Sequence, residues 1–239
     1  MQSRNFRLQR VGDINWLERN YHFQEISFSL DELMVVDATR GEKDIQKFAQ
    51  SVRRLVNNVF IPVAAGGGIT NLAHADLLFE NGADKVIVNT ALIKHPDVVA
   101  EIVNKYGTQS LIASIDYKYR DGVPEVLIKD GSESVDMSLS DYINYVASLN
   151  VGEILLNSID KDGTGFGYDM TTLEAVTENI STPLILMGGA GNERHLEEGL
   201  QYDFVSAVAT ANLFNFIGNG LPNARQYLLK QNANLANWE

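Results

Sequence analysis

The chain of 239 residues contains no cysteine, which excludes disulfide bonds and thiolate chemistry. It also lacks any apolar run near the roughly 20 residues of a membrane-spanning helix, and residues 1–10 contain no apolar signal core. Basic residues are too few for a general nucleic-acid binder, because 19 Lys and Arg stand against 31 Asp and Glu, a net charge of −12. The sequence therefore predicts a cytoplasmic protein without membrane or nucleic-acid partners.

No metal or cofactor motif is present either. The four histidines have no metal-ligand spacing, and we expect surface roles for them. The sequence contains no P-loop, no G-x-G-x-x-G fingerprint and no G-x-S-x-G elbow. We therefore predict no metal and no cofactor.

Short apolar runs alternate with amphipathic stretches along the whole chain. The runs occupy residues 33–37, 61–65, 85–89, 111–116, 153–160, 183–187 and 205–211. Between them, apolar residues three and four apart predict helices over 44–57, 72–81 and 96–106. This alternation is typical of a parallel sheet covered by helices. Since no linker-like segment divides the chain, we predict one domain over residues 1–239.

An internal repeat suggests how the sheet closes. The glycine-rich turns 66–68 and 188–191 begin 122 residues apart, and Asp37 and Asp160 end apolar runs 123 residues apart. These spacings predict two half-barrels that form an α/β (β/α)8 barrel by duplication. The alternative is that glycine-rich turns recur by chance in any α/β protein.

The repeat also predicts that the first barrel strand is missing from this chain. The second half begins with the run 111–116, whose first-half counterpart would end before Met1. Seven strands would leave an open sheet edge. Residues 1–8 and another chain are the two candidate substitutes.

The carboxyl ends of barrel strands form the active-site mouth in this fold class. Two groups of residues there have the composition of phosphate sites, because glycine lets a phosphate approach backbone N–H groups at a helix N-terminus. The first group is Gly67, Gly68, Asn89 and Thr90, and the second is Gly189, Gly191, Ala211 and Asn212. We expect a substrate with a phosphate at each end. The alternative is that these glycines only permit tight turns.

Asp116 is the candidate general acid/base. It ends an otherwise apolar strand, where partial desolvation raises a carboxyl pKa towards a useful range. The alternative is a structural carboxylate that organises the next loop. Asp37, Asn157 and Asp162 lie at strand ends or in the loop that follows, and they are candidate substrate contacts.

At these positions the sequence resembles HisF, the cyclase subunit of imidazole glycerol phosphate synthase. The resemblance runs from about Asn5 to Phe216 and rests on GGGI (66–69), NGADKVIVNTA (81–91), EILLNSIDKDGTGFGYD (153–169) and GGAG (188–191). It implies a barrel that receives ammonia from a HisH-type glutaminase and acts on a bisphosphorylated substrate. The lyase-type family reaction yields imidazole glycerol phosphate and an aminoimidazole carboxamide ribotide in histidine biosynthesis.

The resemblance also implies roles for individual residues. Asp116 matches one of two catalytic aspartates in the family. Gly68, Asn89 and Thr90 match one phosphate site, while Gly163, Gly189, Ala211 and Asn212 fall on the other. Glu32, Lys85 and Glu153 match the charged ring that gates ammonia at the barrel floor, and the fourth gate residue, an arginine, would lie on the missing strand.

Several positions depart from the family pattern. The second catalytic aspartate would lie on the missing strand, and the lysine that the family usually has soon after that strand aligns with Gln2. Met187 and Asn212 replace serines, and Asn157 replaces a threonine. These departures resemble divergent HisF-like paralogues encoded with surface-polysaccharide genes, which would pass ammonia to a sugar amidotransferase. Loss of one acid/base group predicts proton transfer slower by roughly 10²–10⁴-fold.

Two other functional classes remain open. One is a non-catalytic glutaminase partner or activator. The other is a different phosphate-binding barrel enzyme, such as a sugar-phosphate isomerase, for which the charged floor would serve no purpose.

Overall fold

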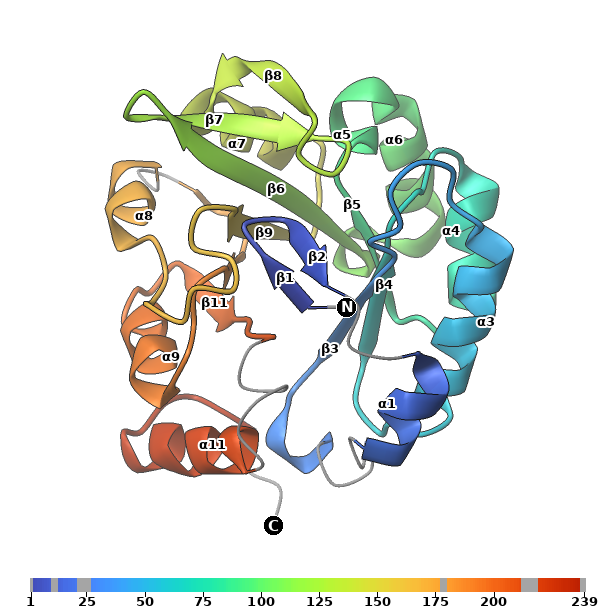
Figure 1. Cartoon of the computed structure of the whole chain (residues 1–239). Coiled ribbons are helices and arrows are strands. Elements are labelled where there is room, and N and C mark those ends of the chain that lie inside the picture. The colour runs from blue at the N-terminus through green and yellow to red at the C-terminus, as the bar shows by residue number, and fades with distance from the viewer. Residues whose placement is uncertain (1, 10–12, 21–26, 177–179, 212–218, 237–239) are drawn as a thin grey trace.

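Seven parallel strands form one curled sheet in the computed structural model, which describes residues 2–9, 13–20, 27–176, 180–211 and 219–236 (Figure 1). The sheet order is β11-β10-β9-β6-β5-β4-β3. The strands are β3 (Leu33–Val36), β4 (Val63–Gly66), β5 (Lys85–Val88), β6 (Leu111–Arg120), β9 (Glu153–Ser158), β10 (Leu184–Met187) and β11 (Val205–Val208). Each lies within an apolar run or overlaps one, so the predicted sheet of (β/α)8 type is confirmed.

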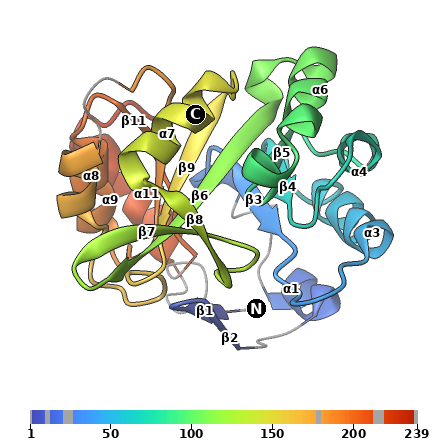
Figure 2. The same cartoon turned by 90° about the horizontal axis from the view of Figure 1, so that it is seen from above.

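Helices surround the sheet on its outer side (Figures 1 and 2). They are α1 (Ile14–Asn20), α3 (Ile45–Val56), α4 (Leu72–Glu80), α5 (Ala91–Lys94), α6 (Pro96–Tyr106), α7 (Leu139–Ser148), α8 (Met170–Val176), α9 (Glu193–Leu200) and α11 (Gly220–Lys230), with 3-10 turns η1 (Ser27–Ser29) and η2 (Thr108–Ser110). The three predicted helices are confirmed. Asp44 caps α3 by accepting a hydrogen bond from Lys47 N at 3.0 Å. Within the described ranges, no helix has the length and apolarity needed to cross a membrane.

The sheet remains open between β3 and β11 in the described part of the chain, since each pairs on one side only. Residues 2–9 do not fill this gap. They form a separate hairpin of β1 (Gln2–Arg4) and β2 (Arg7–Gln9). The proposal that residues 1–8 supply the eighth strand is therefore wrong for the described residues.

The β1–β2 hairpin instead lies across the carboxyl ends of the barrel strands. The Ser3 hydroxyl donates to the Asp162 carboxylate at 2.5 Å, and Asn5 N donates to the Asp162 carbonyl at 3.0 Å. Arg40 holds the other side by donating to the Phe6 carbonyl at 2.5 Å. The hairpin thus joins the loops that follow β3 and β9.

Strand β6 continues past the sheet and turns back as an antiparallel ribbon with β7 (Val123–Ile128) and β8 (Glu133–Ser138). The turn between β6 and β7 is Asp121-Gly122, whose φ angles of 50° and 81° suit a two-residue hairpin. This ribbon was not predicted from the sequence, although an Asp-Gly pair between two strands is a usual signal of a β-hairpin.

An apolar layer fills the barrel interior between its floor and its mouth. It consists of Ala64, Ile87, Ile112, Leu155 and Ile185, with Met34, Met187, Ala207 and Ala209 packed against them. A larger cluster joins the outer side of the sheet to the helices. The interior layer separates the polar residues of the floor from those of the mouth.

Replacing Ile112 by Ala should destabilise the chain by about 2–5 kcal/mol, because Ile112 is fully buried and the truncation leaves a cavity. The midpoint and slope of urea unfolding, followed by circular dichroism, measure this cost. Val123→Ala is the matched control, since Val123 is an exposed aliphatic residue and should cost less than about 0.5 kcal/mol. Equal costs for the two variants would show that the interior layer does not carry stability.

Candidate functional site

Asp116 is held at the mouth of the barrel by two amide side chains. Asn157, opposite it on β9, donates through Nδ2 to Asp116 Oδ1 at 2.8 Å. Asn89, which follows β5, donates through Nδ2 to Asp116 Oδ2 at 3.2 Å and to the Ser114 carbonyl at 3.0 Å. Each carboxylate oxygen therefore has one fixed donor.

The surroundings of Asp116 favour its protonated form. Burial of the carboxyl group raises the pKa of Asp116 to about 7; the Asn157 hydrogen bond acts in the opposite direction, and the negative charges of Asp130 and Asp162 raise it further. A group with this pKa can both give and accept a proton near neutral pH. Burial was predicted from the sequence to raise the pKa of Asp116, and the environment of this carboxyl group agrees with that prediction.

Asn157 has capacity left for a further interaction. The residue is 5% exposed, and its Oδ1 atom is buried without a hydrogen-bond partner among the described residues. A buried acceptor without a partner is costly. Asn157 can therefore hold Asp116 with its nitrogen while its oxygen accepts from a ligand.

The two glycine-rich turns have the same backbone construction. Gly67 has φ of 111° after β4, and Gly188, 121 residues later, has φ of 95° after β10. A Cβ atom would lie 2.6 Å from the Asp37 carbonyl oxygen at Gly67 and 2.6 Å from the Ser158 carbonyl oxygen at Gly188. Both positions therefore require glycine. The two turns repeat as predicted, but with a spacing of 121 residues, which pairs Asp37 with Ser158 and not with Asp160.

A histidine supports each turn from the helix that follows. Thr70 N donates to His74 Nδ1 at 3.4 Å, and Gly191 N donates to His195 Nδ1 at 3.1 Å. An asparagine N-cap, Asn71 in α4 and Asn192 in α9, precedes each histidine by three residues. The expectation of mere surface roles for these two histidines is wrong; their shared spacing of 121 residues was the available signal.

Other predicted phosphate-site residues lie beside these turns. Thr90 Oγ1 accepts from Lys129 N at 3.1 Å, which ties the end of β5 to the β7–β8 ribbon. Thr210 donates to the Ala190 carbonyl at 3.4 Å, so the segment that leads to Ala211 lies beside the second turn. Gly68 and Gly189 also have positive φ. Asn212 lies outside the described residues.

Three predicted residues have internal partners in the mouth. Asp37 Oδ1 accepts from Thr39 N at 2.9 Å, an arrangement that organises its own loop. Asp162 binds the β1–β2 hairpin through its carboxylate. Gly163 lies directly against the Ser3 carbonyl, so the hairpin backbone occupies the space that a side chain would fill.

The sheet order places Asp116 between the two turns. The first turn follows β4 and the second follows β10, with β5, β6 and β9 between them. The parallel strands bring all of these carboxyl ends to one side. A ligand that reached both turns would pass over Asp116.

Charged residues meet at the opposite end of the barrel. Lys85 Nζ lies 2.8 Å from Glu32 Oε2 and 2.6 Å from Glu153 Oε2. Burial lowers the pKa of Lys85, but hydrogen bonds and charge from Glu153 and Glu32 outweigh it, so the pKa is raised and Lys85 stays protonated. Glu32 Oε1 is buried without a partner among the described residues. The three predicted gate residues are thus in contact.

Among the described residues, no cluster of three or more His, Asp or Glu side chains is placed to hold a metal ion. The groups that meet at the mouth include the Asp116 carboxyl group, the Asn89 and Asn157 side-chain amides and the backbone N–H groups of the two turns.

A family model described as histidine biosynthesis protein matches residues 11–218. An imidazole glycerol phosphate synthase subunit HisF from Pyrobaculum aerophilum is 38% identical over 198 residues, which cover 83% of this chain and 78% of the relative. The chain belongs to the HisF family.

Two further relatives extend the comparison. A protein of Parasynechococcus marenigrum, provisionally named imidazole glycerol phosphate synthase subunit hisF2, is 46% identical over 99% of this chain and 88% of its own length. The HisF subunit of Dictyoglomus thermophilum is 36% identical over 91% of this chain and 85% of its own length. The resemblance inferred from the motifs is confirmed.

We predict that Asn157→Ala raises the pKa of Asp116 above about 7, because the variant removes a hydrogen bond that stabilises the ionised carboxylate. Carbon-13 NMR titration of the aspartate carboxyl groups measures the shift, with Asp116→Asn to assign the signal. Asn104→Ala, on the exposed side of α6, is the control and should change nothing. A lower or unchanged pKa in Asn157→Ala would refute the role of this hydrogen bond.

Proposed function

We propose that this HisF family member is the synthase subunit of a glutamine-dependent enzyme, with ammonia delivered by a HisH-type glutaminase. The observation that carries the proposal is the position of Asp116, between two glycine-rich turns of the same construction. This arrangement fits a substrate with a phosphate at each end and its reacting atoms in the middle. The ammonia gate, partner and residue roles that follow are parts of this proposal.

The two turns bind the phosphates. Backbone N–H groups and the N-termini of α4 and α9 favour negative charge at these positions. Because the net charge of the chain is −12, backbone groups rather than basic side chains are expected to bind the phosphates. Residues Gly67, Gly68, Asn89 and Thr90 form one site, and Gly163, Gly189, Ala211 and Asn212 contribute to the other. Asp37 and Asp162 shape the loops between them.

Asp116 moves the proton. Its pKa of about 7 allows the carboxylate to accept a proton from the attacking nitrogen and the carboxyl group to return one to a leaving group. Asn89 and Asn157 fix its orientation. In the family reaction, these steps lead to imidazole glycerol phosphate and the carboxamide ribotide.

Ammonia enters through the floor. Lys85, Glu32 and Glu153 form a polar entrance, and the apolar layer above it admits a small neutral molecule better than a hydrated ion. The path ends beside Asp116 and the free Oδ1 of Asn157. Charged floor residues would be an unexplained cost in a barrel that used no ammonia.

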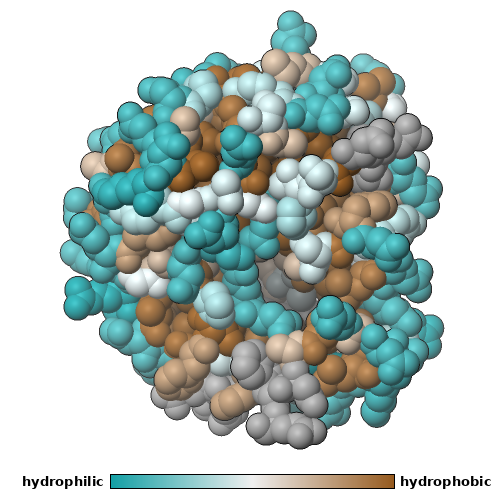
Figure 3. All heavy atoms as spheres, turned by 180° about the vertical axis from the view of Figure 1, so that it is seen from behind, coloured by the Kyte–Doolittle hydropathy of each residue, from teal (hydrophilic) through white to brown (hydrophobic). Residues whose placement is uncertain are grey.

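The glutaminase docks on this same end. Phe28 is 65% exposed and lies shortly before β3, while Phe60 is 77% exposed and lies shortly before β4. Apolar side chains reach the surface in several places on the face turned away from the β1–β2 hairpin (Figure 3). Exposed aromatic residues are typical anchors of a protein interface.

We assign the chain to the divergent branch that passes ammonia to a sugar amidotransferase. Two observations support this assignment. Met187 and Asn157 differ from the serine and threonine expected from the resemblance, and the hisF2 relative shares more identity with this chain, 46%, than the Pyrobaculum HisF subunit, 38%. A non-catalytic glutaminase activator is the second candidate, because the floor and its aromatic residues do not require a reactive mouth.

A cyclase assay with ammonium salts and the family substrate tests the catalytic role. We expect turnover about 100-fold or more below that of the Pyrobaculum subunit, and a further loss of roughly 10²–10⁴-fold in Asp116→Asn, because proton transfer is impaired. Asp136→Asn, an exposed aspartate, is the control. Turnover equal to the Pyrobaculum subunit would overturn the divergent assignment, and turnover that survives Asp116→Asn would overturn the role of Asp116.

Mixing the chain with a HisH-type glutaminase tests the partner. We expect complex formation and stimulated glutamine hydrolysis, with affinity lowered about tenfold or more in Phe60→Ala, because this residue is an exposed anchor. Val123→Ala removes an exposed apolar residue from the β7 ribbon and should leave affinity unchanged. Absence of both complex and stimulation would rule out the ammonia role.

A further inference from the structure

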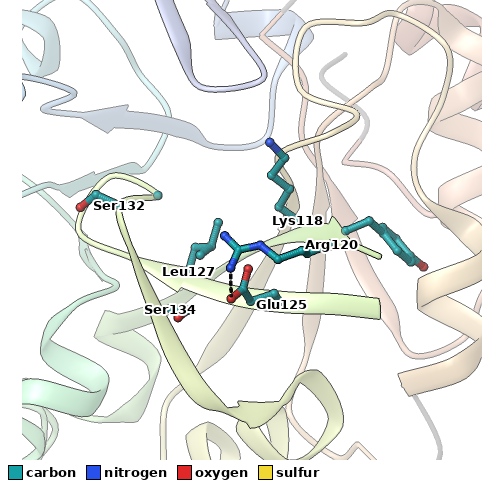
Figure 4. A pocket seen from close by; sticks show the side chains of 8 residues that line it. Lys118, Arg120, Glu125, Leu127, Ser132 and Ser134 are labelled. Carbon is teal, nitrogen blue, oxygen red and sulfur yellow. Dashed lines mark ion pairs between the residues drawn. The ribbon is translucent and has the colours of Figure 1, made fainter. Parts of the chain in front are cut away.

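A polar cavity lies outside the two glycine-rich turns, on the antiparallel ribbon that extends β6. Its volume is about 530 Å³. Residues from all three ribbon strands and the β7–β8 turn line it, including Lys118, Arg120, Glu125, Leu127, Ser132 and Ser134 (Figure 4). We call this cavity the outer pocket.

The outer pocket continues the face of β6 that carries Asp116. Side chains alternate along a strand, so Asp116, Lys118 and Arg120 share one face. The hydroxyls of Tyr117 and Tyr119 bind Asp169 and Thr172 beside α8, on the other face. A ligand that leaves the barrel mouth along β6 therefore reaches the outer pocket.

The register of the ribbon places three further lining residues on the same side. Leu127 lies opposite Asp116, Glu125 lies opposite Lys118, and Ser134 pairs with Leu127 from β8. The Ser132 hydroxyl at the turn donates to the Lys129 carbonyl at 2.6 Å and keeps its acceptor capacity. The pocket thus combines hydroxyl groups with charged side chains.

Lys118 is the group in the outer pocket whose charge is not neutralised. Arg120 lies 3.2 Å from Glu125, and the two side chains form an ion pair across the ribbon. The Lys118 side chain points away from this pair (Figure 4), and it makes no hydrogen bond or ion pair with the described residues. By contrast, Lys129 on the same ribbon lies 2.5 Å from Glu133.

We propose that the outer pocket binds an anionic group, a carboxylate or a phosphate, on a hydroxylated part of the substrate. Lys118 supplies the positive charge and the serines supply hydroxyl contacts. This site is a third anchor beyond the two turns, and it selects ligands that extend past the barrel mouth. The inference rests on the proposed function only in placing the reacting atoms of the substrate at Asp116.

Amide NMR shifts of the full chain test this proposal with three probes: D-glucuronate, D-glucose 6-phosphate and uncharged D-glucose. We expect at least one of the two anionic sugars to shift the amides of residues 131–134, and D-glucose to leave them unchanged. Lys118→Met should weaken that binding about tenfold, the effect of losing one charge-assisted hydrogen bond. Which anion shifts these amides identifies the group as carboxylate or phosphate.

Lys129→Met is the matched control, since it removes an ion-paired lysine from the same ribbon and should leave binding unchanged. Unchanged unfolding midpoints in both variants would exclude a folding defect. The proposal is overturned if neither anion shifts residues 131–134, if D-glucose shifts them equally, or if Lys118→Met binds as the unmodified chain does.

Inorganic phosphate, followed at the amides of Gly68 and Gly189, reports on the two turns separately. A response at residues 131–134 without one at either turn would refute the proposed function while supporting the outer pocket. Responses at both turns would support the proposed function, and the outer pocket is refuted beside them if D-glucuronate and D-glucose 6-phosphate both leave residues 131–134 unshifted.

Discussion

The pairing of β6 with β9 is the constraint on which the site depends. It sets Asp116 opposite Asn157, so that an amide donor meets a carboxyl group at a depth where an unsatisfied carboxylate would be strongly unfavourable. Since β6 and β9 are interior strands of the sheet, the same pairing places Asp116 between the turns after β4 and β10. A register slip of one residue would turn Asp116 to the opposite face.

The interior of the barrel divides into three levels with different roles. Lys85 pairs with two glutamates at the floor, apolar side chains fill the middle, and amides surround Asp116 at the mouth. Charged side chains are tolerated at both ends of the barrel because each contacts an oppositely charged or hydrogen-bonding side chain, whereas a charged side chain in the apolar middle would have no such contact. This layering is what connects the proposed ammonia entrance to the proposed proton carrier.

The repeating features of the fold could be predicted from the sequence, but the contacts between segments distant in the chain could not. Apolar runs and glycine-rich turns predicted the seven strands, because their signals are local. Asp116 was recognisable as a polar end to an apolar strand. The donor role of Asn157, the contacts of His74 and His195, and the docking of the β1–β2 hairpin on Asp162 were not predictable, since each depends on how separate segments align in space.

The most direct test of the account is the pKa of Asp116 measured with and without saturating inorganic phosphate. If anions occupy the two turns on either side of this carboxyl group, their charge disfavours its ionised form, and the pKa must rise. The account predicts that rise, together with shifts of the amides of both Gly68 and Gly189. An unchanged pKa at saturation, or amide shifts at one turn alone, would contradict the picture of a single mouth that holds a doubly charged ligand over Asp116.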